Sequence, residues 1–303
     1  MNAAPVIPAM PTPSFYKPRT KEEKASTVFG PPLSFLLYGG KGTQKTLALG
    51  QVVRDGFYKK VLYINLDHST EVWATDPAII AAIDDERIII ESIDTTTDPG
   101  ARMRIESIIL ELAGVYREPA TGALLPHPGI PNFGFDMVAI DTVNLMHEVA
   151  LKNFMATTYN AAGTKLDNLA AYGKVAIWMD EMLRLIHNSP RFTGGFVAHA
   201  KTVEGDTGVQ KIMVKLSGAF KDSIATIPSI VAYLDKEKDP ESGEVVLTAT
   251  LGNSDLCDSG NRYDLPDKIY GFNLSELLAT IPNNRPASAE APAPSIVPAA
   301  VAA

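Results

Sequence analysis

Short apolar runs alternate with longer segments of helical period along most of the chain. Apolar residues bounded by turn-forming residues predict strands at 33–38, 61–66, 87–93, 135–140, 195–200, 229–234 and 244–251. Such alternation predicts an α/β fold, in which a mostly parallel central sheet is flanked by helices. The last two strands are separated by DPESGE, which predicts an antiparallel hairpin at the edge of the sheet.

Two of the segments between the strands carry apolar residues at helical spacing. The first predicted helical face consists of Ile105, Ile108, Ile109, Leu112 and Tyr116. The second consists of Leu166, Leu169, Ala170, Gly173, Ile177 and Ile186. We expect both faces to pack against the sheet.

The two ends of the chain differ in composition from the segment between them. Residues 1–27 combine prolines with a charged run, and residues 283–303 are rich in proline and alanine. Neither end has enough apolar surface to offset the entropy lost on ordering. The predicted organisation is a disordered arm at 1–27, a folded core at 28–282 and a disordered tail at 283–303.

A glycine-rich turn, GGKGTQKT, joins the first predicted strand to a helical pattern. Gly39, Lys45 and Thr46 match the P-loop template G-x-x-x-x-G-K-S/T, but Gln44 stands where the template has its second glycine. In a P-loop the backbone N–H groups cradle phosphates, the lysine reaches the terminal phosphates and the hydroxyl holds Mg²⁺. The candidate ligands of ATP are therefore Gly39, Gly40, Lys41, Gly42, Thr43, Gln44, Lys45 and Thr46.

Gln44 leaves two questions open. Glutamine at this position either accepts a cost on the order of 1 kcal/mol or signals an altered turn, so the motif indicates nucleotide binding more firmly than fast hydrolysis. The alternative is a glycine-rich strand-to-helix turn that happens to carry a lysine.

Two aspartates follow predicted strands. Asp141 ends the strand at 135–140, and Asp67 comes directly after the strand at 61–66. Ligands of open α/β sheets gather beyond the carboxyl ends of the strands, so Asp141 together with Thr46 is a candidate Mg²⁺ site. Asp67 either orients the water that attacks the γ-phosphate or caps the turn before a short helix.

His199 lies near the end of the strand predicted at 195–200, and we expect it at the same edge of the sheet. It either senses the γ-phosphate and passes its presence to the following loop, or is a structural histidine. Tyr63 and Trp73 are more typical of packing residues than of residues that stack on adenine. His127, His147 and His187 have no such sequence context, and we assign them no role.

A basic segment follows His199. Residues 201–223 form a weakly periodic stretch with three glycines, which predicts a mobile loop able to bind a nucleic-acid backbone. Its candidate DNA-binding residues are Lys201, Lys211, Lys215 and Lys221. The alternative is a solvated charged face. A second candidate loop at 152–165 carries Phe154 and Tyr159, which suit stacking on single-stranded bases.

The bulk composition limits the setting of the protein. The chain has 303 residues, a net charge of −8 and a pI of about 5.2, which argues against coating nucleic acid with its whole surface. The single Cys257 excludes an intramolecular disulfide. No apolar run approaches the length of a membrane span and the first residues lack a signal-peptide pattern, so we expect a cytoplasmic protein.

Taken together, these motifs resemble a RecA-type ATPase core, specifically the minimal phage-encoded kind found among single-strand annealing proteins of the Sak group. The resemblance rests on GGKGTQKT, INLDHSTE, DMVAID, FVAHAK, KLSGAFKDS and SGNRYDLPDKI, and it covers about residues 33–270. It implies a RecA-like core without a further DNA-binding domain, located in the host cytoplasm.

The resemblance also implies roles for individual residues. Lys45 and Thr46 would be the P-loop lysine and threonine, Asp141 the magnesium aspartate, Asp67 the catalytic carboxylate and His199 the phosphate sensor. It implies that Arg262, in NRYDLP, reaches the nucleotide of a neighbouring subunit. The family's glutamate is replaced here by Asp67, which together with Gln44 puts efficient turnover in doubt.

The expected activity is a DNA-dependent ATPase that binds single-stranded DNA, assembles into a filament or ring and promotes annealing. A single-strand-binding protein is a further candidate partner. Two alternatives stay open: a nucleotide-dependent replication or helicase-loading factor, and a nucleotide-binding structural or regulatory protein that does not hydrolyse ATP.

Overall fold

The computed structural model describes residues 33–127, 132–159, 163, 167–204, 210–218 and 220–281. All of them belong to the compact unit Pro32–Ala303. The predicted arm at 1–27 and the predicted tail at 283–303 lie outside the described residues. Within the described ranges, none of the helices is long and apolar enough to cross a membrane.

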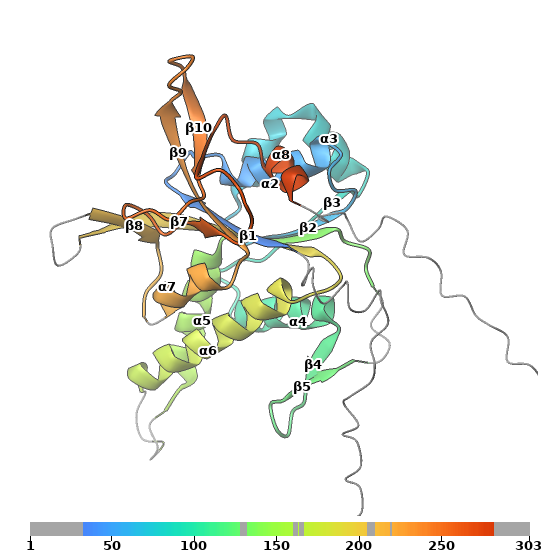
Figure 1. The fold of residues 1–303 in the computed structure, drawn as a ribbon. Helices are drawn as coiled ribbons and strands as arrows, with labels where there is room; N and C mark the ends of the chain where they lie inside the picture. The colour runs from blue at the N-terminus through green and yellow to red at the C-terminus, as the bar shows by residue number, and fades with distance from the viewer. Residues whose placement is uncertain are drawn as a thin grey trace, which may run out of the picture. The chain divides into compact units, whose positions relative to one another are not determined.

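The centre of the fold is a ten-stranded sheet with the order β12-β10-β9-β1-β7-β6-β2-β3, with β11 paired to β9 and β8 paired to β7 (Figure 1). The strands β9, β1, β7, β6, β2 and β3 are mutually parallel. The remaining four pair antiparallel. The strands are β1 (Ser34–Gly39), β2 (Val61–Asn65), β3 (Ile88–Ser92), β6 (Met137–Asp141), β7 (Thr193–Glu204), β8 (Gln210–Val214), β9 (Ile230–Lys238), β10 (Val245–Thr250), β11 (Gly260–Asn261) and β12 (Lys268–Tyr270).

The predicted strands are all present, and the α/β fold class is confirmed. The hairpin of β9 and β10 is antiparallel as expected, although β12 pairs with β10 and forms the outermost strand. A small second sheet, β4 (Val115–Arg117) with β5 (Leu124–Pro126), was not predicted. Its strands are only three residues long, too short to show a period.

The prediction of a loop beginning at Lys201 is wrong. β7 continues to Glu204 and pairs antiparallel with β8, with Ala200 opposite Val214 and Glu204 opposite Gln210. The start of the predicted loop is therefore a β-hairpin, followed by the short helices α7 (Phe220–Ser223) and η2 (Ile224–Thr226). We call β7 and β8 from Ala200 to Val214 the basic hairpin. Residues 205–209 at its turn lie outside the described residues.

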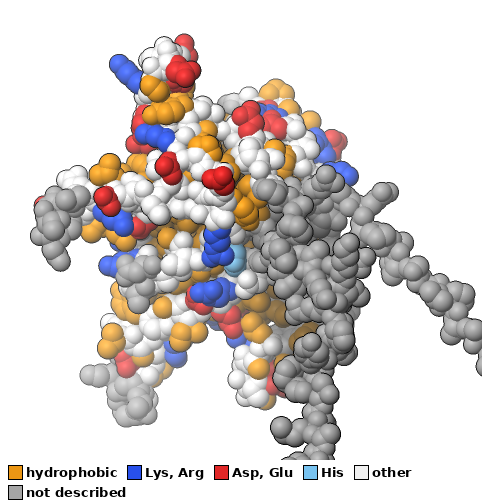
Figure 2. All heavy atoms as spheres, viewed as in Figure 1, with side chains coloured by type: hydrophobic (Ala, Val, Ile, Leu, Met, Phe, Trp, Pro, Cys, Tyr) orange, Lys and Arg blue, Asp and Glu red, His pale blue; other side chains and the backbone are white. Residues whose placement is uncertain are grey.

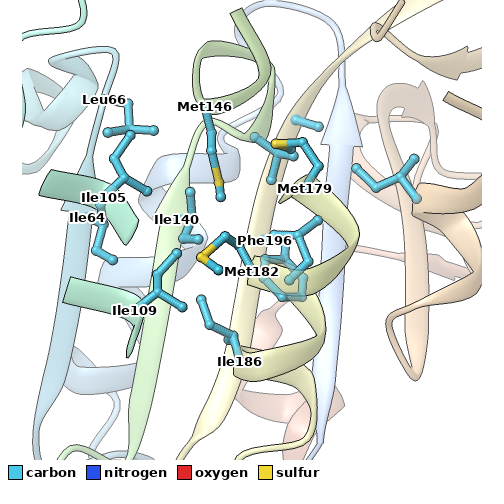
Figure 3. Close-up of a cluster of buried hydrophobic side chains, with 14 of the residues drawn as sticks. Ile64, Leu66, Ile105, Ile109, Ile140, Met146, Met179, Met182, Ile186 and Phe196 are labelled. Carbon is cyan, nitrogen blue, oxygen red and sulfur yellow. The ribbon is translucent and has the colours of Figure 1, made fainter. Parts of the chain in front are cut away.

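Helices cover both faces of the sheet (Figure 1). One face packs against α4 (Ala101–Ala113), α5 (Val143–Thr157) and α6 (Asn168–His187). The other packs against α2 (Lys45–Arg54), η1 (Ser69–Thr75), α3 (Pro77–Asp84) and α8 (Leu274–Thr280). Because successive side chains of a strand point to opposite faces, each buried strand supplies both cores. Figure 3 shows the first core, where Ile64, Ile140 and Phe196 from the sheet meet Ile105 and Met182 from the helices.

The two predicted helical faces had different outcomes. On α4, Ile105, Ile109 and Leu112 are buried as expected, whereas Tyr116 lies in β4 and is 38% exposed. On α6 most of the predicted face is wrong, because Leu169 is 84% and Ile177 is 72% exposed. Ile186 is buried as predicted, but the other apolar residues of the buried face were not predicted: Ala171, Val175, Trp178, Met179, Met182 and Leu183. Leu166 lies outside the described residues.

Candidate active site

The loop after β1 has backbone geometry that suits glycine. A Cβ on Gly39 would lie 2.3 Å from the carbonyl oxygen of Leu234 on the neighbouring strand β9, so a side chain at this position would collide with the backbone. Gly42 has a φ of +82°, in the left-handed region that glycine adopts without strain. The loop then enters α2, whose first residue is Lys45.

Gln44 occupies the left-handed backbone that the template glycine would adopt. Its φ is 56° and its ψ is 23°, and it is the residue that directly precedes α2. A left-handed conformation costs a residue with a side chain roughly 1–2 kcal/mol. The sequence left open whether glutamine alters the turn or adopts the backbone of the template glycine. In the structure Gln44 adopts the left-handed backbone, and the protein is destabilised by that amount.

Lys45 is folded back onto its own loop. Its Nζ donates to the carbonyl oxygens of Gly39 (3.2 Å) and Gly40 (2.8 Å) and to Oγ1 of Thr43 (3.1 Å). Burial lowers the pKa of Lys45, although the nearby carboxylates of Asp141 and Asp67 act to raise it. The ammonium group is thus held by uncharged oxygens at the centre of the loop, where an anionic ligand would find a positive charge.

Asp141 is buried at the carboxyl end of β6 and has an asymmetric environment. Three hydroxyl groups donate to Oδ2: Tyr63 at 2.5 Å, Thr46 at 2.6 Å and Ser69 at 3.3 Å. Among the described residues, Oδ1 has no hydrogen-bond partner. Burial and the charge of Asp67 raise the pKa of Asp141, while the three hydroxyl groups act in the opposite direction.

This arrangement fits a divalent cation. One carboxylate oxygen is fixed by three donors and the other is buried and bare, which costs about 1–3 kcal/mol when no partner compensates. A hard cation such as Mg²⁺ is bound by carboxylate and hydroxyl oxygens. Oδ1 of Asp141 and the hydroxyl group of Thr46 are the atoms that would hold it.

Asp67 makes the turn contact that one of the two interpretations from the sequence requires. Its Oδ1 accepts a hydrogen bond from the backbone N–H of Ser69 at 3.0 Å, which stabilises the turn into η1. It also lines the cavity beside the P-loop. A turn residue can therefore lie next to the candidate phosphate site, and its catalytic role stays a prediction.

His199 lies in β7 directly beside the P-loop strand. In the parallel register of β1 and β7 it is the partner of Gly39. Burial and the positive charge of Lys45 are the main causes that lower the pKa of His199, so the imidazole is neutral at pH 7. A neutral ring can donate or accept a hydrogen bond, as a phosphate-sensing residue requires.

The sequence-predicted residues converge on one cavity of ≈ 550 Å³. The structure brings Asp67, Asp141 and His199 to the P-loop from three different strands: Asp67 follows β2, Asp141 ends β6 and His199 lies within β7. The lining residues are Lys41, Gly42, Gln44, Lys45, Thr46, Leu47, Asp67, Ser69, Val72, Asp141 and His199.

Arg262 is not part of this cavity. It follows β11, which pairs with the first residues of β9, and its backbone N–H donates to the carbonyl oxygen of Ser229 at 3.0 Å. One guanidinium nitrogen, Nη2, donates to the carbonyl oxygen of Thr226 at 3.1 Å. Arg262 therefore lies at the amino ends of the central strands, opposite the P-loop. Its predicted role at a neighbouring subunit's nucleotide stays a prediction.

The four candidate DNA-binding lysines differ in their contacts. Nζ of Lys211 lies 2.6 Å from Oδ1 of Asp258, and Nζ of Lys201 donates to the carbonyl oxygen of Leu216 at 2.6 Å. Lys215 and Lys221 are exposed. Figure 2 shows acidic and basic side chains intermingled on the face in view rather than one extended basic surface.

Four residues around the site were missed by sequence reasoning or have a contact that it did not predict. Tyr63 and Trp73 are buried packing residues, as the sequence favoured, but Tyr63 also donates to Asp141 and Nε1 of Trp73 donates to the carbonyl oxygen of Thr46 at 2.9 Å. Ser69 and Asn144 were not singled out. No local pattern marks them, because their partners lie on other strands and helices.

The strand order, the loop between β1 and α2, and the buried aspartate at the end of β6 define a P-loop NTPase with a RecA-like core. The chain belongs to the AAA domain family, whose model matches residues 31–263. It is thus a nucleotide-binding protein of the RecA-like ATPase fold.

Several solved structures are similar to this chain. The flagellar accessory protein FlaH from Methanocaldococcus jannaschii has 8% identity over 83% of this chain and 91% of its own, with a TM-score of 0.42. The RadB recombinase has 14% identity over 80% of this chain and 87% of its own, with a TM-score of 0.42. The ATPase EscN of the enteropathogenic E. coli type III secretion system has 12% identity over 67% of this chain and 43% of its own, with a TM-score of 0.39. A search of curated proteins finds no match.

Proposed function

We propose that the protein is an ATPase that binds single-stranded DNA and promotes annealing and recombination in phage DNA metabolism. The observation that carries the proposal is the continuity of β7. This strand passes His199 at the nucleotide cavity and continues into the basic hairpin, which bears Lys201 and Lys211. The phage context is supported by the resemblance to Sak-type proteins over residues 33–270.

The P-loop would hold the phosphates of ATP through its backbone N–H groups and Lys45. Thr46 and Asp141 would hold Mg²⁺, which supplies neutralisation of phosphate charge when it is bound. Asp67, which lines the cavity, would accept a hydrogen bond from the attacking water. His199 would form a hydrogen bond to the terminal phosphate from the neighbouring strand.

On the DNA side, Lys215 and Lys221 are exposed cations close to the basic hairpin. Exposed lysines neutralise backbone phosphates, and such binding weakens as salt rises. We expect the protein to self-associate on DNA, in a filament or ring, with Arg262 facing the nucleotide of a neighbouring subunit. A single-strand-binding protein is a candidate partner in the same process.

The proposal is tested by ATP hydrolysis and by annealing of complementary strands, each measured with and without single-stranded DNA. We expect hydrolysis to rise with DNA and to disappear in Lys45→Ala. The matched control is Lys59→Ala, which changes an exposed lysine that does not line the cavity. Hydrolysis without any effect of DNA, or DNA-stimulated hydrolysis that persists in Lys45→Ala, would contradict the proposal.

A non-hydrolysing nucleotide-binding protein is the second candidate function, and one observation favours it. Asp67 is one methylene shorter than the glutamate of the family, and one of its oxygens is already engaged by the N–H of Ser69. This candidate predicts that ATP binds without turnover in the natural chain. It also predicts that the double substitution Gln44→Gly and Asp67→Glu produces turnover, which a hydrolysing protein would show already.

A further inference from the structure

The side chain of Asn144 joins the nucleotide cavity to the basic hairpin. Asn144 lies in the first turn of α5 and is only 4% exposed. Its Oδ1 accepts a hydrogen bond from the backbone N–H of His199 at 2.6 Å. Its Nδ2 donates to the backbone carbonyl oxygen of Lys215. The oxygen and the nitrogen of one buried amide thus form hydrogen bonds to two different segments, one at His199 and one at Lys215.

The position of His199 explains why this contact exists. On one side of β7 the pairing with β6 ends at Asp141 and Val197. On the same strand the pairing with β8 begins at Ala200 and Val214. His199 lies between these two partners, so its N–H needs an acceptor from elsewhere. Asn144 supplies that acceptor.

A second hydrogen bond completes the connection between the two segments. The backbone N–H of Lys215 donates to the carbonyl oxygen of His199 at 2.7 Å. His199 and Lys215 therefore contact each other directly, and the Asn144 amide bridges the same two residues. A shift of the His199 backbone would be transmitted to Lys215 and to the base of the basic hairpin.

Asn144 is also tied to the metal-site aspartate through the start of α5. Asp141 ends β6, Thr142 caps α5, and Oγ1 of Thr142 accepts from the N–H of Leu145 at 3.4 Å. Only Thr142 and Val143 therefore separate the residue that carries the carboxylate from the residue that carries the bridging amide. Displacement of Asp141 would displace Asn144 as well.

We propose that Asn144 is a positioning residue that couples the nucleotide site to the basic hairpin. It holds the backbone of His199 at the cavity and transmits changes at Asp141 and His199 to Lys215. The inference rests on the nucleotide-binding part of the proposed function but not on DNA binding. It deepens that function by naming the residue through which ATP would control the DNA-facing segment.

The test compares Asn144→Asp with the natural chain. Aspartate keeps the acceptor for the His199 N–H but replaces the donor by an oxygen that faces the carbonyl oxygen of Lys215. The matched control is Asn153→Asp on the same helix, where Oδ1 accepts from Nε of Arg102 at 2.9 Å and that contact is kept. Asn144→Ser is a second variant, should the aspartate variant fail to fold.

The readout is hydrogen exchange of the full-length protein with and without Mg²⁺ and a non-hydrolysable ATP analogue. In the natural chain and in Asn153→Asp, the analogue should slow exchange at residues 39–46. It should also slow exchange at residues 199–204 and 210–216, on the order of tenfold. In Asn144→Asp and Asn144→Ser, protection should remain at 39–46 and be lost at 199–204 and 210–216.

The outcomes separate the inference from the proposed function. Equal protection of the basic hairpin in the Asn144 variants and in the natural chain would overturn the inference. So would a natural chain in which the analogue slows exchange at residues 39–46 but not in the basic hairpin. A natural chain protected nowhere by the analogue would overturn both. A hairpin that responds through Asn144 in a protein without affinity for single-stranded DNA would support the inference and refute the proposed function.

Discussion

The hydroxyl group of Tyr63 donates a 2.5 Å hydrogen bond to Oδ2 of Asp141. The two residues lie on adjacent strands, β2 and β6, where Tyr63 is the partner of Ala139 and the aspartate lies two residues further along. Tyr63 thus orients a buried carboxylate from the neighbouring strand, while the hydroxyl groups of Thr46 and Ser69 donate to the same oxygen. The bare Oδ1 is left for the cation.

Tyr63→Phe should therefore destabilise the protein without disrupting the core, because phenylalanine fills the same apolar space. A hydrogen bond to a charged group contributes about 1.5–3 kcal/mol, and two donors to Asp141 remain, so we expect a loss of about 1.5 kcal/mol. Urea denaturation measures it. The control is Tyr233→Phe, which removes a 3.2 Å bond to Asp235 at a partly exposed position and should cost less. Equal losses in both variants would contradict the prediction.

Gln44→Gly should stabilise the protein. Relief of the left-handed backbone at φ 56° gains about 1–2 kcal/mol, and the greater freedom of glycine in the unfolded chain offsets about half of it. The control is Gln51→Gly within α2, where glycine should lower the free energy of unfolding by about 1 kcal/mol. Denaturation midpoints that shift in the same direction for both variants would show that Gln44 is not strained.

Lys215 and Lys221 should matter more for single-stranded DNA than Lys211. The first two are exposed, whereas Lys211 is paired with Asp258 at 2.6 Å. Lys215→Ala and Lys221→Ala should each weaken binding severalfold at low salt and reduce its salt dependence by about one counterion. Lys211→Ala should have a smaller effect. Fluorescence anisotropy at several salt concentrations measures this, and unchanged affinity in the first two variants would remove Lys215 and Lys221 as DNA contacts.

Acidification should destabilise the protein through its buried histidines. Burial lowers the pKa of His147, and burial with the charges of Arg262 and Arg184 lowers the pKa of His187, from an ordinary value of 6.5. The unfolded chain then binds more protons, so this part of the stability is present above pH 6.5 and is lost as pH falls toward the lowered pKa values.

Denaturant unfolding at pH 7.5 and pH 5.5 checks this prediction. Nδ1 of His187 and Oγ of Ser34 form a 2.6 Å hydrogen bond. His187→Gln keeps a polar partner for Ser34 but removes the titrating group. The variant should lose less stability between the two pH values than the natural chain. An identical loss in both proteins would show that His187 does not contribute.

The sequence predicted the elements whose signal is local. Alternating side chains and flanking turns marked β1, β2, β3, β6, β7, β9 and β10, and the glycine-rich turn marked the loop before α2. The same local signal was insufficient at α6, where Leu169 and Ile177 have helical spacing but face away from the core. Which face of α6 is buried depends on its packing against α4 and α5, which no window of the sequence contains.

The basic hairpin shows the same limit. Residues 201–204 and 210–214 pair with each other, and Ile212 also forms a bridge to Cys257, far away in the chain. Pairing of this kind is decided by tertiary contacts, so a basic segment that was predicted to be a loop is a pair of strands.

By itself, the sequence determined that the chain has a P-loop, three further strands that carry or precede Asp67, Asp141 and His199, and basic residues after the last of them. The tertiary structure decided what surrounds them. The order of β1, β7, β6 and β2 brings Tyr63 to Asp141 across 78 positions of sequence and Asn144 to His199 across 55. It also places Arg262 at the opposite ends of the strands from the P-loop. These contacts depend on which strands become neighbours, and that choice is set by burying two cores at once rather than by any local preference.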